Sequence, residues 1–397
     1  MSYTYVPWRL PLDGRDPEEE HRASTPLELL FDLSFVVAVA AGASSLHHQL
    51  AHGHVDGLLP FAMMFFGTWW AWLNYSWFAS AYDTGDVVFR LVTFVILTGV
   101  LVFAAGVPRV FGDHPRFTLG VVGYLIMRAA LVPMWLRVAH DDPPVRPIAL
   151  RYAAGVTVVQ ILWVVRLGVP DGAVGVLSFF ALAAAEMVVP YWAENSVEQF
   201  TPWHVEHIVE RFSLFTIIVL GEVILATSQA ISATLDGHGL TWDLAGVIAG
   251  GLLLVLSVWW IYFKRSLAEC VRGRSGFVFG YAHYFVLGSV AAIGAGLATC
   301  VDVVEHSAEG IGARSAALCV AAAVSVYLLA LGTIHAYGDR SFRTMVGPAI
   351  IACLTLAAAF AGTLTDHVGL GVLLIGLVAT GAVVDHQVRK APLMVSD

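Results

Sequence analysis

The chain has 397 residues, of which 58% are apolar and 13% are charged, and its mean hydropathy is +0.75. A soluble domain has about 45–50% apolar and about 25% charged residues. The composition therefore excludes an ordinary soluble globular protein and predicts an integral membrane protein with lipids as partners. The net charge of −9 is less informative than the charge of each loop, and the arginines form no block that would indicate nucleic-acid binding.

Twelve apolar segments in the sequence are candidates for membrane-spanning helices, each of which needs roughly 20 residues. They cover residues 26–47, 58–80, 88–107, 117–139, 148–167, 172–190, 206–231, 243–264, 277–299, 314–336, 345–363 and 369–386. The connecting loops are short, so the sequence predicts an all-α, polytopic membrane helix bundle. We expect an N-terminal tail (1–25), a first six-helix half (26–190), a linker (191–205), a second six-helix half (206–386) and a C-terminal tail (387–397).

The arginines and lysines of the loops predict the orientation of the chain. With the N-terminus inside, sixteen of them fall on the cytoplasmic side and four on the outer side. Because basic residues are enriched in cytoplasmic loops, both termini are predicted to lie in the cytoplasm.

The two predicted halves also share a sequence pattern. Residues 69–74 (WWAWLN) align with residues 259–264 (WWIYFK) at an offset of 190, and residues 27–32 align with residues 209–214 at an offset of 182. We interpret this pattern as an internal repeat of two parallel halves, which would be related by an axis along the membrane normal.

The first predicted span begins with a capping box, in which Thr25 is the cap, Pro26 occupies the first turn and Glu28 reaches back to the cap. Asp32 lies one turn further along the same helix face. A carboxylate at that depth costs several kcal/mol unless it is paired or hydrated. Asp32 is either a structural pairing partner near the inner interface or an acid that lines a cavity.

The second span is rich in tryptophan and continues into a charged loop. Its tryptophans, with Trp72 and Asn74 as candidate site residues, either form an interfacial belt or lie inside the bundle, where indole N–H groups need partners. Asp86 and Arg90 have the spacing of an ion pair along one helix.

Arg128 lies near the middle of the fourth span. Because an arginine cannot face lipid at that depth, we expect it to face the bundle and to pair with a carboxylate. Glu186 is the candidate within the same half, and Asp32 and Glu222 are the other candidates.

The seventh span has a polar beginning, residues 201–211, and an apolar continuation that contains one acid. His204, His207 and Glu210 are spaced by three residues and are weak candidates for metal ligands, although ordinary interfacial residues would show the same pattern. Glu222 is expected past the middle of the membrane, about 18 Å above Glu210 at 1.5 Å per residue.

Three motifs together resemble the bacterial low temperature requirement protein A (LtrA) family. They are residues 26–36 (PLELLFDLSFV), the helix with residues 69–72 (WWAW) that ends in residues 83–86 (DTGD) and Arg90, and residues 209–222 (VERFSLFTIIVLGE). The resemblance covers residues 24–386 and implies a polytopic bacterial inner-membrane protein, but no particular reaction. One departure is Phe212, where the family motif leads us to expect histidine, so a role of that histidine does not carry over.

Three classes of function remain open at this point. The first is a transporter or channel that moves an ion or small solute past Asp32, Glu222 and Arg128. The second is a membrane enzyme that acts on a lipid or a lipid-linked substrate, with His204, Glu206, His207 and Glu210 as acid–base groups at the cytoplasmic interface. The third is a non-catalytic, stress-related membrane protein. The sequence contains no phosphate loop, dinucleotide fingerprint or nucleophile elbow, so we predict no cofactor and no nucleic-acid partner. It assigns no oligomeric state.

Overall fold

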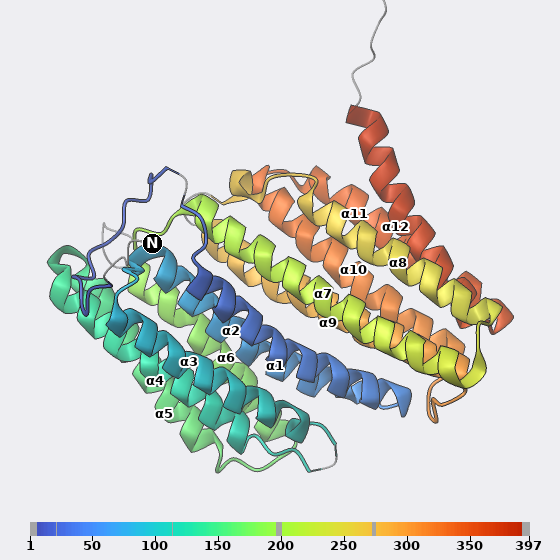
Figure 1. Ribbon diagram of the computed structural model, residues 1–397, viewed down its shortest axis with the longest axis horizontal. Helices are drawn as coiled ribbons and strands as arrows, with labels where there is room; N and C mark the ends of the chain where they lie inside the picture. Colours follow the sequence, from blue (N-terminus) through green and yellow to red (C-terminus); the bar gives the residue numbers. More distant parts are fainter. Residues whose placement is uncertain (1–5, 21, 113, 196–200, 272–274, 391–397) are drawn as a thin grey trace, which may run out of the picture. The chain divides into compact units, whose positions relative to one another are not determined.

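The computed structural model describes residues 6–20, 22–112, 114–195, 201–271 and 275–390, and within these ranges the chain forms twelve α-helices and no strand (Figure 1). The helices are α1 (Pro26–Ala51), α2 (Leu58–Tyr82), α3 (Val87–Gly106), α4 (Thr118–Asp141), α5 (Arg146–Arg166), α6 (Ala173–Glu194), α7 (Val205–His238), α8 (Trp242–Phe263), α9 (Ser275–Glu305), α10 (Ala313–Gly338), α11 (Val346–Gly362) and α12 (Val368–Lys390). The predicted all-α class is therefore confirmed, and each predicted span corresponds to one helix.

Parts of some predicted segments lie outside the described residues. These are residues 1–5 and 21 of the N-terminal tail, 196–200 of the linker, 391–397 of the C-terminal tail, and the loop arginines Arg272 and Arg274.

Ten of the described helices are long and apolar enough to cross a membrane. Helix α2 is not among them, and the apolar part of α12, Val368–Val384, is shorter than the rest. Helix α2 differs because tryptophan, tyrosine and serine interrupt its apolar sequence, and most of its side chains are buried within the protein. Its surroundings are therefore mainly protein, and the polar groups of Trp70, Trp72 and Tyr75 find partners there.

The chain divides into two compact units. The first unit consists of residues 1–42 and 59–215, and the second of residues 43–58 and 216–397. Helices α1 and α7 each contribute to both units, because the boundaries fall inside them.

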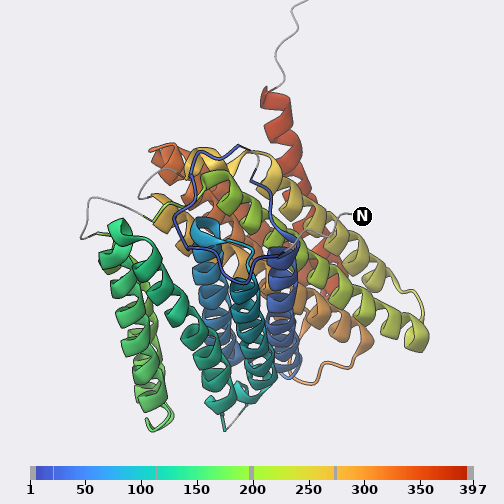
Figure 2. The ribbon, with the colours of Figure 1, turned by 60° about the vertical axis from the view of Figure 1, so that its left-hand side comes forward.

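In the first unit, consecutive helices pack side by side from α3 to α6; Figure 1 shows α3, α4 and α5 together, and Figure 2 shows α5 beside α6. Helices α3 and α4 approach closely at two glycines. A Cβ atom on Gly123 would lie 2.3 Å from the backbone nitrogen of Phe103, and one on Gly99 would lie 2.9 Å from the carbonyl oxygen of Gly123. Small residues at such crossings let helix backbones approach in membrane proteins.

In the second unit, α8 packs against α12, and α10 packs against α9 and α11 (Figure 1). The α8–α12 contact also depends on glycine, because a Cβ atom on Gly250 would lie 2.4 Å from the carbonyl oxygen of Val372.

Candidate functional site

The start of α1 places two carboxylates inside the first unit. The predicted capping box is present: the Glu28 amide donates to Thr25 Oγ1 at 3.3 Å, and the Thr25 amide donates to Glu28 Oε2 at 2.8 Å. Asp32 follows one turn later on the same face, and both carboxylates are fully buried. Carboxylates that are removed from water need compensating donors or charges nearby.

Helix α7 supplies these groups from His207 and Arg211, which are also one turn apart. The Arg211 guanidinium donates two hydrogen bonds to Asp32, at 2.6 and 3.0 Å, and a third to Glu28 at 2.9 Å. His207 Nε2 lies 3.2 Å from Glu28. All four side chains are fully buried. We call Glu28, Asp32, His207 and Arg211 the α1–α7 charge cluster.

Arg211 is a partner of Asp32 that the sequence did not reveal. It was expected in the polar beginning of the seventh span, at the interface, whereas the structure buries its guanidinium completely. The available signal was the spacing: Glu28 and Asp32 share one face of α1, and His207 and Arg211 share one face of α7. Two complementary pairs with the same spacing fit each other across two helices.

Helix α2 completes the cluster through Trp72. The Trp72 indole N–H donates to Asp32 Oδ1 at 2.6 Å, and the ring stacks on Phe215 with 4.5 Å between centroids. Of the two interpretations of the tryptophans, the structure supports the interior one for Trp69, Trp70 and Trp72, which are all buried. Asn74 does not join the site, because its side chain donates to the carbonyl oxygen of Trp70 on its own helix.

A second buried group surrounds Glu186 on α6, and here the predicted pairing is confirmed. Arg128 donates to Glu186 Oε2 at 2.9 Å. Four further donors reach the same carboxylate, at 2.8–3.3 Å, from Trp70, Tyr124, Gln160 and Trp163. We call these six residues the Glu186 cluster. Arg128 Nε and Nη1 have no partner within the described part of the chain, so this guanidinium is held from one side.

The predicted pair of Asp86 and Arg90 is wrong. Asp86 caps α3 by accepting from the Phe89 amide at 2.7 Å, and its charged partner is Arg137 at 2.5 Å. Arg90 instead donates to the carbonyl oxygen of Gly85. Burial raises the pKa of Asp86, but the hydrogen bonds from Arg137 and from the Leu10 and Phe89 amides outweigh it, so the net pKa is below its usual range. Because Asp86 is the N-cap of α3, its carboxylate turns toward the Phe89 amide and Arg137 and does not pair with Arg90.

The weak metal candidates do not form a site. The described residues contain no group of three or more His, Cys, Asp and Glu side chains that could hold a metal ion. His204 instead contacts the Glu19 carbonyl oxygen through Nε2 and accepts from the His207 amide through Nδ1. Glu210 accepts from the Ser24 amide at 3.2 Å.

Glu222 belongs to the second unit, whereas Asp32 and Arg128 belong to the first. Its side chain is half-buried, and it forms no ion pair or hydrogen bond with any side chain that the structure describes. The carboxylate partner of Arg128 is Glu186, and the cationic partner of Asp32 is Arg211, so Glu222 pairs with neither.

Comparisons with known proteins agree with the motifs. The model of the bacterial low temperature requirement A protein (LtrA) family matches residues 23–383. An uncharacterized protein of Rhizobium meliloti (strain 1021) is 26% identical over 292 residues, which are 70% of this chain and 69% of that protein. No solved structure matches the chain.

Proposed function

Because the chain belongs to the bacterial low temperature requirement A family and its described part forms a bundle of long apolar helices, we propose that it is a membrane transporter or channel for an ion or small solute. The observation that carries this proposal is the α1–α7 charge cluster. Ionisable groups within membrane helices are costly and mark ion pathways and proton relays by default.

The charge balance of the cluster suits it to bind one positive charge. Glu28 and Asp32 contribute two negative charges, and Arg211 contributes one positive charge. With His207 neutral, the cluster has a net charge of −1. A proton on His207, or a bound monovalent cation, brings it to zero. Because the cluster is buried, its state with a net charge of −1 and its neutral state differ in free energy far more than they would in water.

His207 is the group that we propose to exchange the proton. Its Nε2 contacts Glu28, while its Nδ1 is buried and has no partner among the described residues. Histidine changes charge more readily than any other side chain near neutral pH. A proton on Nδ1 would thus alter the charge of the cluster without breaking its contact to Glu28.

We further propose a membrane topology for the chain. All twelve helices cross the bacterial inner membrane as two parallel six-helix halves, and both termini lie in the cytoplasm. This proposal is supported by the distribution of arginine and lysine in the loops and by the pattern shared between residues 69–74 and 259–264. Glu186 and Arg128 would hold the helices around the pathway.

The experiment is ion flux in proteoliposomes of the full chain. Proton, sodium and potassium fluxes are driven by an imposed membrane potential and compared with those of empty liposomes. Asp32→Asn fixes the cluster at zero charge without a proton, and His207→Gln removes the exchangeable proton. We expect each to lower the flux at least about tenfold, which corresponds to about 1.4 kcal/mol.

The matched control is Asp339→Asn in the second unit, where Asp339 pairs with Arg265 at 2.6 Å but remains partly exposed. Its flux should equal that of the wild type. Flux no greater than that of empty liposomes with all three cations, or full flux in both cluster variants, would contradict the proposal. Elution as a single species and a cooperative thermal unfolding transition check that each variant is folded.

A further inference from the structure

Arg166, at the end of α5, is a buried cation without a buried anion. Its side chain is 7% exposed. The guanidinium donates from Nη2 to the Gly175 carbonyl oxygen at 2.8 Å, and Nε has no hydrogen-bond partner among the described residues. No acidic side chain forms an ion pair with it in the part of the chain that the structure describes; Asp171, nearby in sequence, is exposed.

Aromatic rings surround this guanidinium. Its Cζ atom lies 4.7 Å from the ring centroid of Phe117, 5.5 Å from that of Phe179 and 5.9 Å from that of Trp163. Each contact stabilises a cation by about 0.5–2 kcal/mol. An unpaired buried charge costs several kcal/mol. The rings and one carbonyl oxygen offset much of this cost, but Nε still has no acceptor among the described residues.

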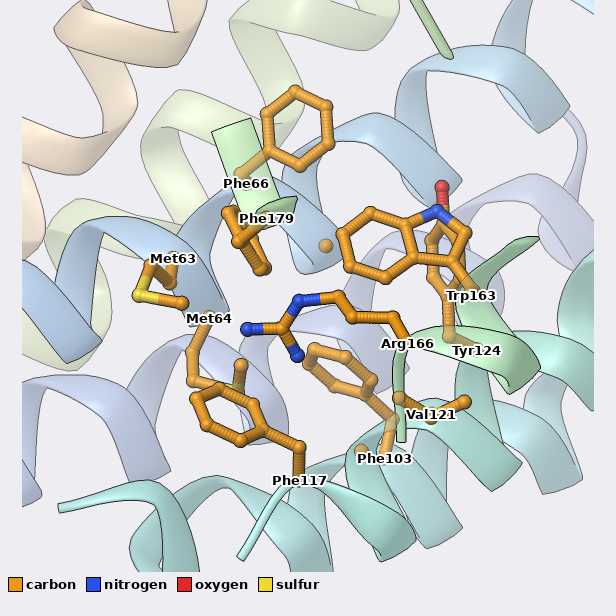
Figure 3. A pocket seen from close by; sticks show the side chains of 12 residues that line it. Met63, Met64, Phe66, Phe103, Phe117, Val121, Tyr124, Trp163, Arg166 and Phe179 are labelled. Atoms are coloured by element: carbon orange, nitrogen blue, oxygen red, sulfur yellow. The ribbon is translucent and has the colours of Figure 1, made fainter. Parts of the chain in front are cut away.

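A small cavity adjoins the same guanidinium. Its volume is about 30 Å³, and Arg166 supplies the charge among otherwise apolar and aromatic lining residues. Figure 3 shows the guanidinium pointing into the space between Phe117, Phe179 and Met64. A volume of this size suits one small ion or water molecule and is too small for sulfate, phosphate or an organic carboxylate.

We propose that this cavity binds a dehydrated halide ion, with Arg166 as its counter-charge. The guanidinium is permanently protonated and has an unused N–H donor. Because the lining is apolar, chloride and bromide, which lose water more easily than fluoride, fit this site best. The site lies in the first unit and does not depend on the transport proposal.

The experiment uses the purified full chain in detergent, with sodium bromide or sodium chloride replacing sodium gluconate at constant ionic strength. We expect a saturable rise in Tm and saturable broadening of the ³⁵Cl resonance that bromide reverses. Arg166→Gln should weaken binding at least about tenfold. Arg116→Gln, which removes an exposed arginine, should bind as the wild type does.

A second variant tests the cavity in case Arg166→Gln fails to fold. Gly120 lines the cavity, and a Cβ atom there would meet only Met64 Sδ at 3.8 Å, which is ordinary van der Waals contact. Gly120→Ala should therefore fold and should reduce halide affinity severalfold by occupying space. The proposal is overturned if the wild type shows no saturable halide effect, which would indicate that water alone occupies the cavity. It is also overturned if Gly120→Ala and a folded Arg166→Gln both bind like the wild type.

Discussion

The two units differ in what they bury. Among the described residues, every buried aspartate, glutamate and arginine belongs to the first unit, including Glu28, Asp32, Arg128, Glu186 and Arg211. The buried polar side chains of the second unit are hydroxyls and histidines. The first unit therefore requires specific ionic partners, whereas the second is held together mainly by apolar packing.

The same difference appears at positions that the predicted repeat aligns. Trp69 and Trp70 are buried in the first unit, whereas Trp259 and Trp260 are each 45% exposed in the second. Trp72 donates to a carboxylate, while the aligned Tyr262 contacts a histidine, His283, at 3.0 Å. Similar sequence in the two halves thus accompanies different environments, and the proposed ionic function is assigned to one unit only.

The largest expected effect comes from Arg211→Met. The substitution leaves Glu28 and Asp32 buried without a cation, and removal of one partner from a buried ion pair costs about 3–5 kcal/mol. Unfolding in mixed detergent, followed by circular dichroism, measures this loss. Arg265→Met removes a cation from a partly exposed pair in the second unit and should cost at most about 1 kcal/mol. Equal losses in the two variants would remove the distinction between the units.

A smaller loss is expected for Glu186→Gln. The amide keeps one acceptor oxygen, turns the other into an NH2 donor that faces existing donors, and removes the charge that Arg128 needs; hydrogen bonds to charged groups contribute about 1.5–3 kcal/mol. In the second unit, Glu222→Gln should change the unfolding free energy by no more than about 0.5 kcal/mol, because its half-buried side chain has no described partner. If Glu222→Gln proves the more damaging substitution, the Glu186 cluster is not a stabilising centre.

The aligned tryptophans offer a matched pair of substitutions. Trp70→Phe removes one of the donors to Glu186 and should cost about 1–2 kcal/mol, because four other donors remain. Trp260→Phe shortens an exposed side chain and should cost about 0.5 kcal/mol or less. The two unfolding midpoints, measured in the same detergent, test whether burial rather than residue type decides the effect.

The smallest effects concern pH, and the two units should show opposite signs. Burial, together with the charge of Glu28, raises the pKa of Asp83 above its ordinary value. Asp83 therefore contributes stability in acid, below its ordinary pKa, and this is lost as pH rises through the raised pKa. Asp83→Asn should raise Tm at pH 7 and lose that advantage in acid.

Asp339 in the second unit provides the contrast. The hydrogen bond from Arg265 holds the pKa of Asp339 below its ordinary value. Asp339 therefore contributes stability above its ordinary pKa, and this is lost as pH falls through the lowered pKa. Asp339→Asn should lower Tm slightly at pH 7 and have no effect in strong acid. Tm measured from strong acid to pH 8 checks both signs, and parallel curves for the two variants would contradict them.

The sequence by itself determined the membrane class, the twelve helices and the capping box at Thr25 and Glu28. These features depend on local properties: apolar length, the residues at helix starts and the period of the helix. The sequence also predicted that Arg128 pairs with a carboxylate and limited the candidates to three, because an arginine in the middle of an apolar helix has few carboxylates within reach; the structure selects Glu186.

For the other charged residues, only the tertiary structure decided which side chains form ion pairs. It paired Asp32 with Arg211, gave Asp86 to Arg137 instead of Arg90, and left Glu222 without a described partner. It also placed Arg166 among aromatic rings beside a small cavity. The physical reason is that pairing depends on the rotation and depth of each helix relative to its neighbours. Hydropathy determines that a segment is helical and apolar, but it does not determine which face of that helix meets which partner.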